Sequence, residues 1–291
     1  MILVMKVGYQ GVEGAFSNIA AKQIFPCENY ISFKTFFDVL EAIEEDKIDC
    51  GIVPIENSYA GRVAGMHNLF RDFCDKNLFI VTEKMLKVEH CLCGLEGAKI
   101  ANITHIFSHE QALMQCQKNI SKMLPNAMCS AKENTAVAAK FVAESANKNF
   151  AAICSKEACN RYGLTILKEN FQDANDNYTL FVGLSKKKNT INSNTINSNT
   201  ANSNKTILTS LLFEVKNVSG ALYKALKCFA EQDIDLVKIE SYIPATSSKS
   251  AMFFITTRGN IADKNMKMAL QNLNEFAKNV YIFGSYFADR I

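Results

Sequence analysis

The sequence contains little of what marks membrane proteins or nucleic-acid-binding proteins. No uninterrupted apolar run approaches the length of a membrane span. The 32 basic and 29 acidic residues leave a net charge of only +3, and they are spread along the chain without the basic stripe that nucleic-acid binding needs. The composition therefore predicts no nucleic-acid partner and no membrane partner.

Signals for export and for metal binding are scarce as well. The opening “MILVMK” has only five residues before a lysine, too few for a secretory apolar region, so we expect a cytoplasmic protein. The ten cysteines then fit reduced thiols used as small hydrophobic residues better than disulfides. Cys91 and Cys93 are separated by one residue, and Cys154 and Cys159 have no matching histidine pair, so we predict no zinc site.

One segment divides the chain by its composition. Residues 189–204 read “NTINSNTINSNTANSN”, a five-residue repeat of Asn, Thr and Ser with almost nothing to bury, which predicts a disordered tether. “KKK” at 186–188 precedes it. We therefore predict a first unit at 1–185, a linker at 186–205 and a second unit at 206–291.

In the first unit, short apolar runs alternate with helical patterns. Strand patterns are “ILVMKVGY” and residues 48–55, and helical patterns are residues 17–23 and the segment that places Phe36, Phe37, Leu40 and Ile43 on one face. Later, “THIF” precedes “SHEQALMQC”, “AMCSA” precedes “NTAVAAKFVAE” and “FAAIC” precedes “KEACNRYG”. This alternation predicts an α/β fold with a mostly parallel sheet, in which ligands bind where strand ends meet helix starts.

The second unit has the element order of a ferredoxin-like, split-βαβ sandwich. Strand patterns at 206–215, 235–242, 250–257 and 279–284 combine with helical patterns at 220–231 and 263–277. The resulting order, βαββαβ, is a common scaffold for small sensing domains. “VKNVSGALYKAL” puts a glycine at the start of the first helix, where the carboxylate of an amino acid would fit.

The turns of the first unit carry polar residues suited to anion binding. “GYQGVEGAFS” brings Gly8, Gly11 and Gly14 before a helix start, although their spacing does not fit the dinucleotide fingerprint G-x-G-x-x-G. “IENS” places Asn57 and Ser58 where a helix N-cap belongs, “FSHEQ” and “ENTA” offer further caps, and “NDNYTLF” is a polar strand entry. Any one of them alone is most simply a cap. Together they predict several helix N-termini around one crevice that binds a small polyanionic acid.

The order of these motifs extends the interpretation. “YQGVEGAFS”, “VPIENSYAG”, “HCL” at 90–92, “FSHEQALMQC”, “NTAVAA”, “AAICSKEACNRYGL” and “NYTLF” resemble, in that order, the catalytic domain of the prephenate dehydratase family. “GALYKAL” and “KIES” in the second unit resemble the ACT domain of that family. The resemblance covers nearly the whole chain outside the linker.

The resemblance implies a catalytic domain with two lobes like those of periplasmic ligand-binding proteins. Residues of roughly 1–85 and 165–185 would form one lobe, and residues 86–164 the other. The implied reaction converts prephenate to phenylpyruvate with loss of carbon dioxide and water, in L-phenylalanine biosynthesis. It needs a proton donor at the departing hydroxyl, a grip on the side-chain carboxylate and no strong stabilisation of the ring carboxylate. Neither a metal nor an organic cofactor follows from it.

The resemblance also implies roles for single residues. The family's “TRF” motif carries an essential threonine that corresponds to Thr179, which would otherwise read as an ordinary β-branched strand residue. Asn57 and Ser58 would contact the substrate, and Glu56 would contact it or order the site. His109 is either a base or simply a first-turn residue. The remaining implied substrate contacts are Ser108, Gln111, Thr135, Ala136, Asn177 and Phe181.

The ACT resemblance implies that phenylalanine binds to the second unit and inhibits the first. The site would lie near a helix start, across a subunit interface of a homodimer or homotetramer. “ESYIP” stands here in place of the family's shorter “ESRP”. The implied phenylalanine contacts are Asn217, Gly220, Ala221, Leu222, Glu240 and Ser241.

One position departs from the family pattern. “TLF” replaces “TRF”, so Leu180 stands where the family has an arginine, whose planar fork suits a carboxylate. Either the protein is a catalytically impaired small-acid-binding or sensor protein, or the charge is relocated. Arg62, four residues past Ser58, would lie on the same face of the helix predicted there and could hold the substrate carboxylate. An exposed surface arginine is the simpler interpretation of Arg62.

Arogenate dehydratase is the nearest enzymatic alternative. It acts on the same ring with an amino acid side chain in place of the keto acid. No single residue of the sequence separates the two activities.

Overall fold

The computed structural model describes residues 5–26, 29–188, 206–216, 218–242 and 250–289. Its contacts divide the chain into two compact units. The first comprises Met1–Val39, Ile52–Val63 and Met85–Phe181, and the second comprises Leu40–Gly51, Ala64–Lys84 and Val182–Ile291. The expected linker falls largely outside the described residues, at 189–205.

One sheet of the first unit has the order β2-β1-β3-β11. β1 (Lys6–Gln10) pairs in parallel with β2 (Asn29–Phe33), and β3 (Cys50–Asn57) and β11 (Tyr178–Ser185) follow. α1 (Phe16–Ile24) packs on this sheet, and α2 (Phe36–Glu44) precedes β3. The shared core is apolar and consists of Val7, Tyr9, Ile19, Ala20, Ala21, Ile52, Leu86 and Phe181.

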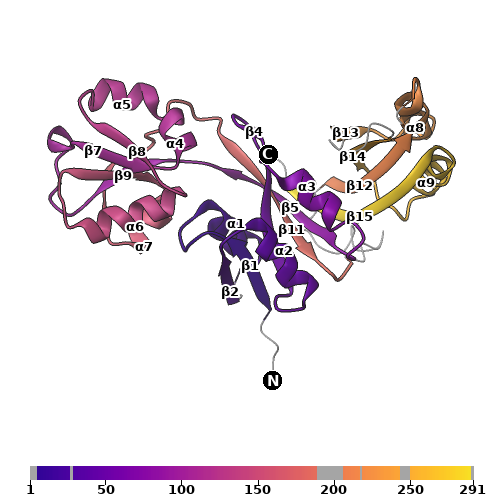
Figure 1. Ribbon diagram of the computed structural model, residues 1–291, viewed down its shortest axis with the longest axis horizontal. Coiled ribbons are helices and arrows are strands. Elements are labelled where there is room, and N and C mark those ends of the chain that lie inside the picture. The colour runs from indigo at the N-terminus through magenta and orange to yellow at the C-terminus, as the bar shows by residue number, and fades with distance from the viewer. Residues whose placement is uncertain (1–4, 27–28, 189–205, 217, 243–249, 290–291) are drawn as a thin grey trace. The chain divides into compact units, whose positions relative to one another are not determined.

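The other sheet of the first unit has the order β10-β6-β9-β7-β8. Its strands are β6 (Cys91–Gly94), β7 (His105–Ser108), β8 (Met128–Ala131), β9 (Phe150–Cys154) and β10 (Thr165–Lys168). Figure 1 shows helices on both faces: α4 (Glu110–Gln115) and α5 (Gln117–Met123) on one, α6 (Thr135–Ser145) and α7 (Lys156–Arg161) on the other. A 3-10 turn, η1 (Ile100–Asn102), precedes β7. Each face has its own core, as the α/β prediction requires.

The lobe boundary differs from the expected one. β10 pairs antiparallel with β6, so residues 165–168 belong to the second sheet. By sheet membership the boundary lies after Lys168 rather than before Thr165. β7 is parallel to both β8 and β9, whereas β6 is antiparallel to β9, so this sheet is mixed.

The predicted helix after β3 is wrong, because “IENSYAGR” forms a β-hairpin. Asn57 pairs with Gly61 and Glu56 with Arg62, across β3 and the short β4 (Gly61–Arg62). Asn57 Oδ1 accepts hydrogen bonds from the backbone N–H groups of Tyr59 (3.0 Å) and Ala60 (2.9 Å). An asparagine side chain that closes such a turn competes with helix formation, and Gly61 supplies the positive φ of 70° that ends it.

The second unit contains the predicted βαββαβ order. Its elements are β12 (Thr206–Lys216), α8 (Ala221–Ala230), β13 (Leu236–Tyr242), β14 (Ser250–Arg258), α9 (Lys264–Phe276) and β15 (Ala277–Asp289). The strands run antiparallel in the order β13-β14-β12-β15. α8 and α9 cover one face, over a core that includes Phe213, Phe229, Ile255 and Leu273.

The second unit also takes in a part of the chain expected in the catalytic domain. β15 pairs in parallel with β5 (Phe79–Lys87), with Phe287 opposite Thr82. α3 (Met66–Asp72) precedes β5 and falls in the same unit. Strand pairing therefore joins 64–84 to the C-terminal segment. No helix within the described ranges is long and apolar enough to cross a membrane.

Candidate active site

A cavity of about 250 Å³ lies within the first unit. Residues from both of its sheets line the cavity, and six of them were expected from the sequence: Asn57, His109, Gln111, Thr135, Thr179 and Phe181. Further lining residues include Gln10, Phe16, Ser17, His90, Gln115, Glu133 and Asn134. The structure thus brings together residues up to 171 positions apart, from Gln10 to Phe181.

Helix starts surround this cavity, as the polar turns predict. The first turns of α1 and α6 line it through Phe16, Ser17 and Thr135. The side chain of Asn134 caps α6 by accepting from the Val137 N–H at 2.8 Å, whereas no side-chain hydrogen bond caps α1. Since the first N–H groups of a helix carry partial positive charge, the uncapped start of α1 can attract an anion.

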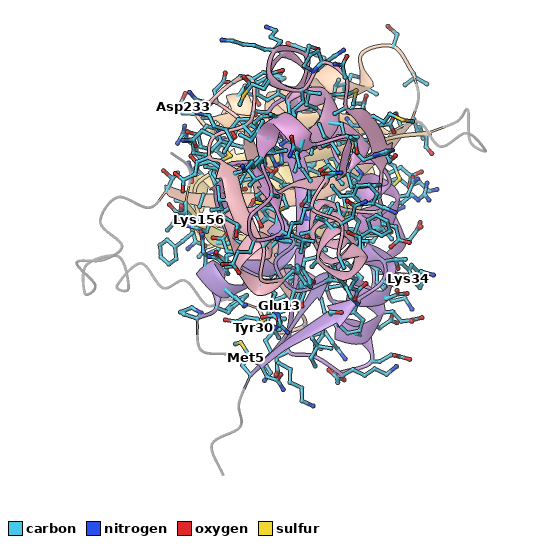
Figure 2. The ribbon with its side chains drawn as sticks, turned by 90° about the vertical axis from the view of Figure 1, so that its left-hand side faces the viewer. Met5, Glu13, Tyr30, Lys34, Lys156 and Asp233 are labelled. Atoms are coloured by element: carbon cyan, nitrogen blue, oxygen red, sulfur yellow. The ribbon has the colours of Figure 1, made fainter. Side chains whose placement is uncertain are left out.

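The turn before α1 is held in place by α7. Glu13, labelled in Figure 2 with Lys156 at the start of α7, forms an ion pair with Arg161 at 2.6 Å. Ser155 Oγ donates to the Gly14 carbonyl at 2.8 Å. A Cβ added to Gly14 would stand 2.8 Å from the backbone of Ala158, so only glycine fits this approach. These contacts fix where α1 begins beside the cavity.

The side chain of Asn57 has a fixed orientation. Its Oδ1 accepts from two backbone N–H groups in the hairpin turn, so Nδ2 must point the other way. Nδ2 faces three acceptors: Asn177 Oδ1 at 2.8 Å, Thr179 Oγ1 at 3.0 Å and the Tyr178 carbonyl at 3.1 Å. The Asn57 amide therefore joins β3 to β11 at the cavity wall.

Thr179 receives this hydrogen bond as an acceptor. Because the Asn57 amide donates to Oγ1, the hydroxyl hydrogen of Thr179 remains for another acceptor. Thr179 is half-buried and lines the cavity, as does Phe181 two residues further on the same face. The arrangement positions a hydroxyl donor at the cavity wall.

Asn177 extends the hydrogen-bond chain to the second sheet. It is 2% exposed, and its Nδ2 donates to Gln115 Oε1 at 3.0 Å. Gln115 Oε1 also contacts Nε2 of His90 at 3.0 Å. A continuous series of side chains, Asn57, Asn177, Gln115 and His90, thus runs along the cavity.

Three residues predicted to contact the substrate, Ser58, Ser108 and Ala136, make other contacts in the structure. Ser58 Oγ donates to the Asp176 carbonyl and accepts from the Tyr178 N–H, both at 3.0 Å, so its hydroxyl ties the hairpin to β11. Ser108 is fully buried, and its hydroxyl donates to the Ile153 carbonyl at 2.6 Å. Ala136 is fully buried in the core beneath α6. None of the three lines the cavity of about 250 Å³.

Glu56, Arg62 and Leu180 lie on the opposite face of the sheet from the cavity residues. Successive strand residues point to opposite faces, and Asn57 and Thr179 share the face on which their side chains meet. Glu56 and Leu180, one position along their strands, therefore lie on the other face. Arg62 is the cross-strand partner of Glu56 and shares that face. An arginine at position 180 would point away from the cavity.

Several residues that line the cavity were not predicted to do so, among them His90 and Gln115. His90 was noticed only within “HCL”, and Gln115 only within “ALMQC”. Burial lowers the pKa of His90, although its hydrogen bond to Gln115 acts in the opposite direction. A polar side chain inside an apolar strand pattern is the one signal that pointed to His90.

A second cavity of about 340 Å³ adjoins these residues. It shares Gln111 and Gln115 with the first cavity and has Asn177 and Lys118 in its wall. The lining of the first cavity, as far as the structure describes it, contains no lysine or arginine. An anion in the first cavity would therefore be held by backbone and side-chain N–H groups.

We predict that Asn57→Asp lowers the free energy of unfolding by about 2 kcal/mol, because a carboxylate oxygen would face Asn177 Oδ1 and the Tyr178 carbonyl without a hydrogen to donate. Asn126→Asp is the matched control, since Asn126 is exposed and the substitution adds the same charge. Urea denaturation of both variants and of the parent measures the difference. Equal stability of the two variants would contradict the Asn57 hydrogen-bond assignment.

Comparisons with known proteins identify the family. The chain matches the prephenate dehydratase family over residues 7–189. The prephenate dehydratase of Lactococcus lactis subsp. cremoris is 35% identical, with 97% of each chain covered. Arogenate dehydratase 2 of Petunia hybrida is 32% identical, over 98% of this chain and 72% of the relative. A prephenate dehydratase from Arthrobacter aurescens, solved in complex with L-Phe, has a TM-score of 0.84 at 24% identity, over 98% of this chain and 90% of that chain. The resemblance read from the sequence is confirmed: the chain belongs to the prephenate dehydratase family and is a carbon–oxygen lyase.

Proposed function

We propose that the protein converts prephenate to phenylpyruvate, a decarboxylating dehydration in L-phenylalanine biosynthesis, in the cavity of about 250 Å³. The observation that carries the proposal is the Thr179 hydroxyl, which accepts from Asn57 Nδ2 at 3.0 Å and lines that cavity. Membership of the prephenate dehydratase family supports it.

The reaction breaks two bonds of the substrate ring. The C–O bond breaks, its electron pair stays with the oxygen, and the oxygen takes up a proton and leaves as water. The bond to the ring carboxylate also breaks, its electron pair enters the ring, and carbon dioxide leaves. Thr179 is the proton donor in this proposal, because Asn57 occupies a lone pair of Oγ1 and leaves its hydrogen for the departing oxygen. A proton from solvent then restores the hydroxyl.

The two carboxylates of the substrate need different treatment. The side-chain carboxylate fits the uncapped start of α1 at Phe16 and Ser17, where partial positive charge is available. The ring carboxylate loses its charge as carbon dioxide leaves, so a cation beside it would stabilise the ground state more than the transition state. The described lining of the cavity, in which Glu133 is the charged residue and no lysine or arginine occurs, suits this requirement.

Arogenate dehydration is the second candidate function. Arogenate carries an ammonium group where prephenate carries a ketone, and the Glu133 carboxylate in the cavity wall favours a cationic group. The relative from Petunia hybrida bears that name. Parallel assays of the purified protein with prephenate and arogenate, read by product absorbance, separate the two activities.

We predict that Thr179→Val lowers kcat on the better substrate by about 100-fold or more, because a group of the same shape replaces the proton donor. Thr179→Ser is the matched control and keeps kcat within about tenfold, since the hydroxyl is retained. Steady-state kinetics on both variants measure the effect. A Thr179→Val variant with the activity of the parent would eliminate Thr179 as the proton donor, and a parent inactive on both substrates would favour a binding-only protein.

The departure at Leu180 yields a separate prediction. Arg62 shares a sheet face with Glu56 and Leu180, so we propose that Arg62 balances the charge of Glu56 rather than holding the substrate carboxylate. Arg62→Gln is then expected to keep kcat/KM within about threefold of the parent, the scale of an exposed charge pair. A large fall in kcat/KM that is partly restored by adding Leu180→Arg would contradict this and support relocation of the family's charge to Arg62.

We further propose that residues 206–291 form an ACT domain that binds L-phenylalanine and inhibits the catalytic domain at 1–185. The βαββαβ order supports this, together with Gly220, which begins α8 at a φ of 78° without a side-chain cap. Ala221 and Leu222 form the first turn of α8, and Glu240 and Ser241 lie on β13. Asn217, the remaining expected contact, lies outside the described residues.

Titration calorimetry with L-phenylalanine tests this regulatory role. We expect binding, with weaker prephenate affinity once phenylalanine is bound, because linkage requires the two effects to be reciprocal. D-phenylalanine is the matched control ligand. Absence of heat at millimolar L-phenylalanine would overturn the proposal for residues 206–291 without affecting the catalytic one.

We also propose that the protein is a cytoplasmic homo-oligomer. The described cysteines are free thiols, which fits a reducing compartment. Large apolar side chains stand exposed in the second unit at Val218, Tyr223 and Ile239, which supports contact between subunits of a homodimer or homotetramer.

A further inference from the structure

His90 is the buried residue of the cavity wall whose hydrogen bonds are incomplete. It is 2% exposed, and its main chain is fixed by hydrogen bonds with Gln172 (2.8 Å) and Phe171 (2.7 Å). The ring lines the cavity of about 250 Å³ and meets Phe16 edge-on, with ring centroids 5.7 Å apart. Among the described residues, Nδ1 of His90 is the one buried side-chain nitrogen or oxygen without a hydrogen-bond partner.

The amide series along the cavity determines which nitrogen of His90 carries the proton. Backbone N–H groups orient Asn57, Asn57 Nδ2 then orients Asn177 Oδ1, and Asn177 Nδ2 orients Gln115 Oε1. Gln115 Oε1 is an oxygen without a hydrogen, so His90 Nε2 must donate to it across 3.0 Å. A neutral imidazole with its proton on Nε2 leaves Nδ1 as a bare acceptor.

The surroundings keep this imidazole neutral. Burial disfavours the charged form and lowers the pKa of His90. A buried acceptor without a donor costs stability, and each such group in a folded protein calls for an explanation, such as a catalytic role or a bound water or ion. Nδ1 therefore has no donor among the described residues, and the residue that carries it lines the cavity of about 250 Å³.

We propose that Nδ1 of His90 accepts a hydrogen bond from the ring hydroxyl of the substrate and so positions that group for departure. This inference rests on the proposed function. The carboxylates and the ketone of prephenate are acceptors, so the hydroxyl is its donor toward a bare nitrogen. The same hydroxyl occurs in arogenate, whose ammonium group is a second donor, so the argument from donors applies to prephenate.

The hydrogen bond orients the departing oxygen. When its hydrogen is held by His90, the lone pairs of the hydroxyl oxygen face the rest of the cavity, whose wall includes Thr179. Thr179 donates the proton in this step and His90 receives none, so His90 stays neutral throughout. His90 is thus a binding and positioning residue that touches the substrate.

Two substitutions distinguish the role of Nδ1 of His90 from that of Nε2. His90→Asn puts an amide oxygen near the place of Nδ1 and loses the contact with Gln115. His90→Gln reaches Gln115 with its amide and loses the acceptor at Nδ1. We expect His90→Gln to lower kcat/KM by about 10- to 100-fold and His90→Asn to retain more of it. The reverse order would show that His90 serves only to hold Gln115, and would overturn the proposal. Circular dichroism and urea denaturation check that both variants fold.

Binding of unreactive ligands tests the same hydrogen bond without turnover. The probes are 4-hydroxyphenylpyruvate, which carries a ring hydroxyl, and phenylpyruvate, which lacks it. We expect the parent and His90→Asn to bind the hydroxylated ligand about tenfold more tightly, and His90→Gln to bind both ligands equally. Equal binding by the parent, or an unchanged preference in His90→Gln, would overturn the inference. If the parent turns over neither prephenate nor arogenate, the proposed function fails, while this affinity ratio still tests His90.

Discussion

The fixed orientation of one side-chain amide governs the arrangement of the site. Asn57 closes the hairpin turn with its Oδ1, and this leaves Nδ2 to face Asn177, Tyr178 and Thr179. A rotated amide would place an oxygen against Asn177 Oδ1 and the Tyr178 carbonyl, and a nitrogen against two backbone N–H groups. Because of this orientation, Oγ1 of Thr179 accepts from Asn57 and its own hydrogen remains available. The same orientation sets that of Asn177 and then of Gln115, whose Oε1 accepts from Nε2 of a neutral His90.

The charge pattern of the site follows from strand alternation. Asn57 and Thr179 occupy the face toward the cavity, and Glu56, Arg62 and Leu180 occupy the other. The side chain at position 180 consequently projects from the face of the sheet opposite to Thr179. A chain with “TLF” thus keeps Asn57 and Thr179 at the cavity wall, and we propose that the start of α1, rather than a cationic side chain, holds the substrate anion.

The fold could be predicted well from the sequence, and the site only in part. Local periodicity predicted the elements with a clear apolar pattern, such as β7, β9, α6 and the βαββαβ order of the second unit, but it did not predict β2, β5, β6, β10 or α3. The family resemblance predicted substrate contacts at Thr179, Asn57 and His109, which line the cavity of about 250 Å³, and at Ser58, Ser108 and Ala136, which do not. The side chains of these three residues contact residues far along the chain, and the spacing of residues in the sequence does not reveal such contacts. The helix expected after Asn57 failed because its side chain closes a turn as readily as it caps a helix.

A double-mutant cycle of Asn57→Asp and Thr179→Val on kcat tests the central claim, that Asn57 acts on the reaction through the Thr179 hydroxyl. If the claim holds, the loss of activity in the double variant matches that of Thr179→Val alone within about threefold, because contacting residues of one hydrogen-bond network are not additive. If the two losses multiply instead, Asn57 and Thr179 act independently and the account is wrong.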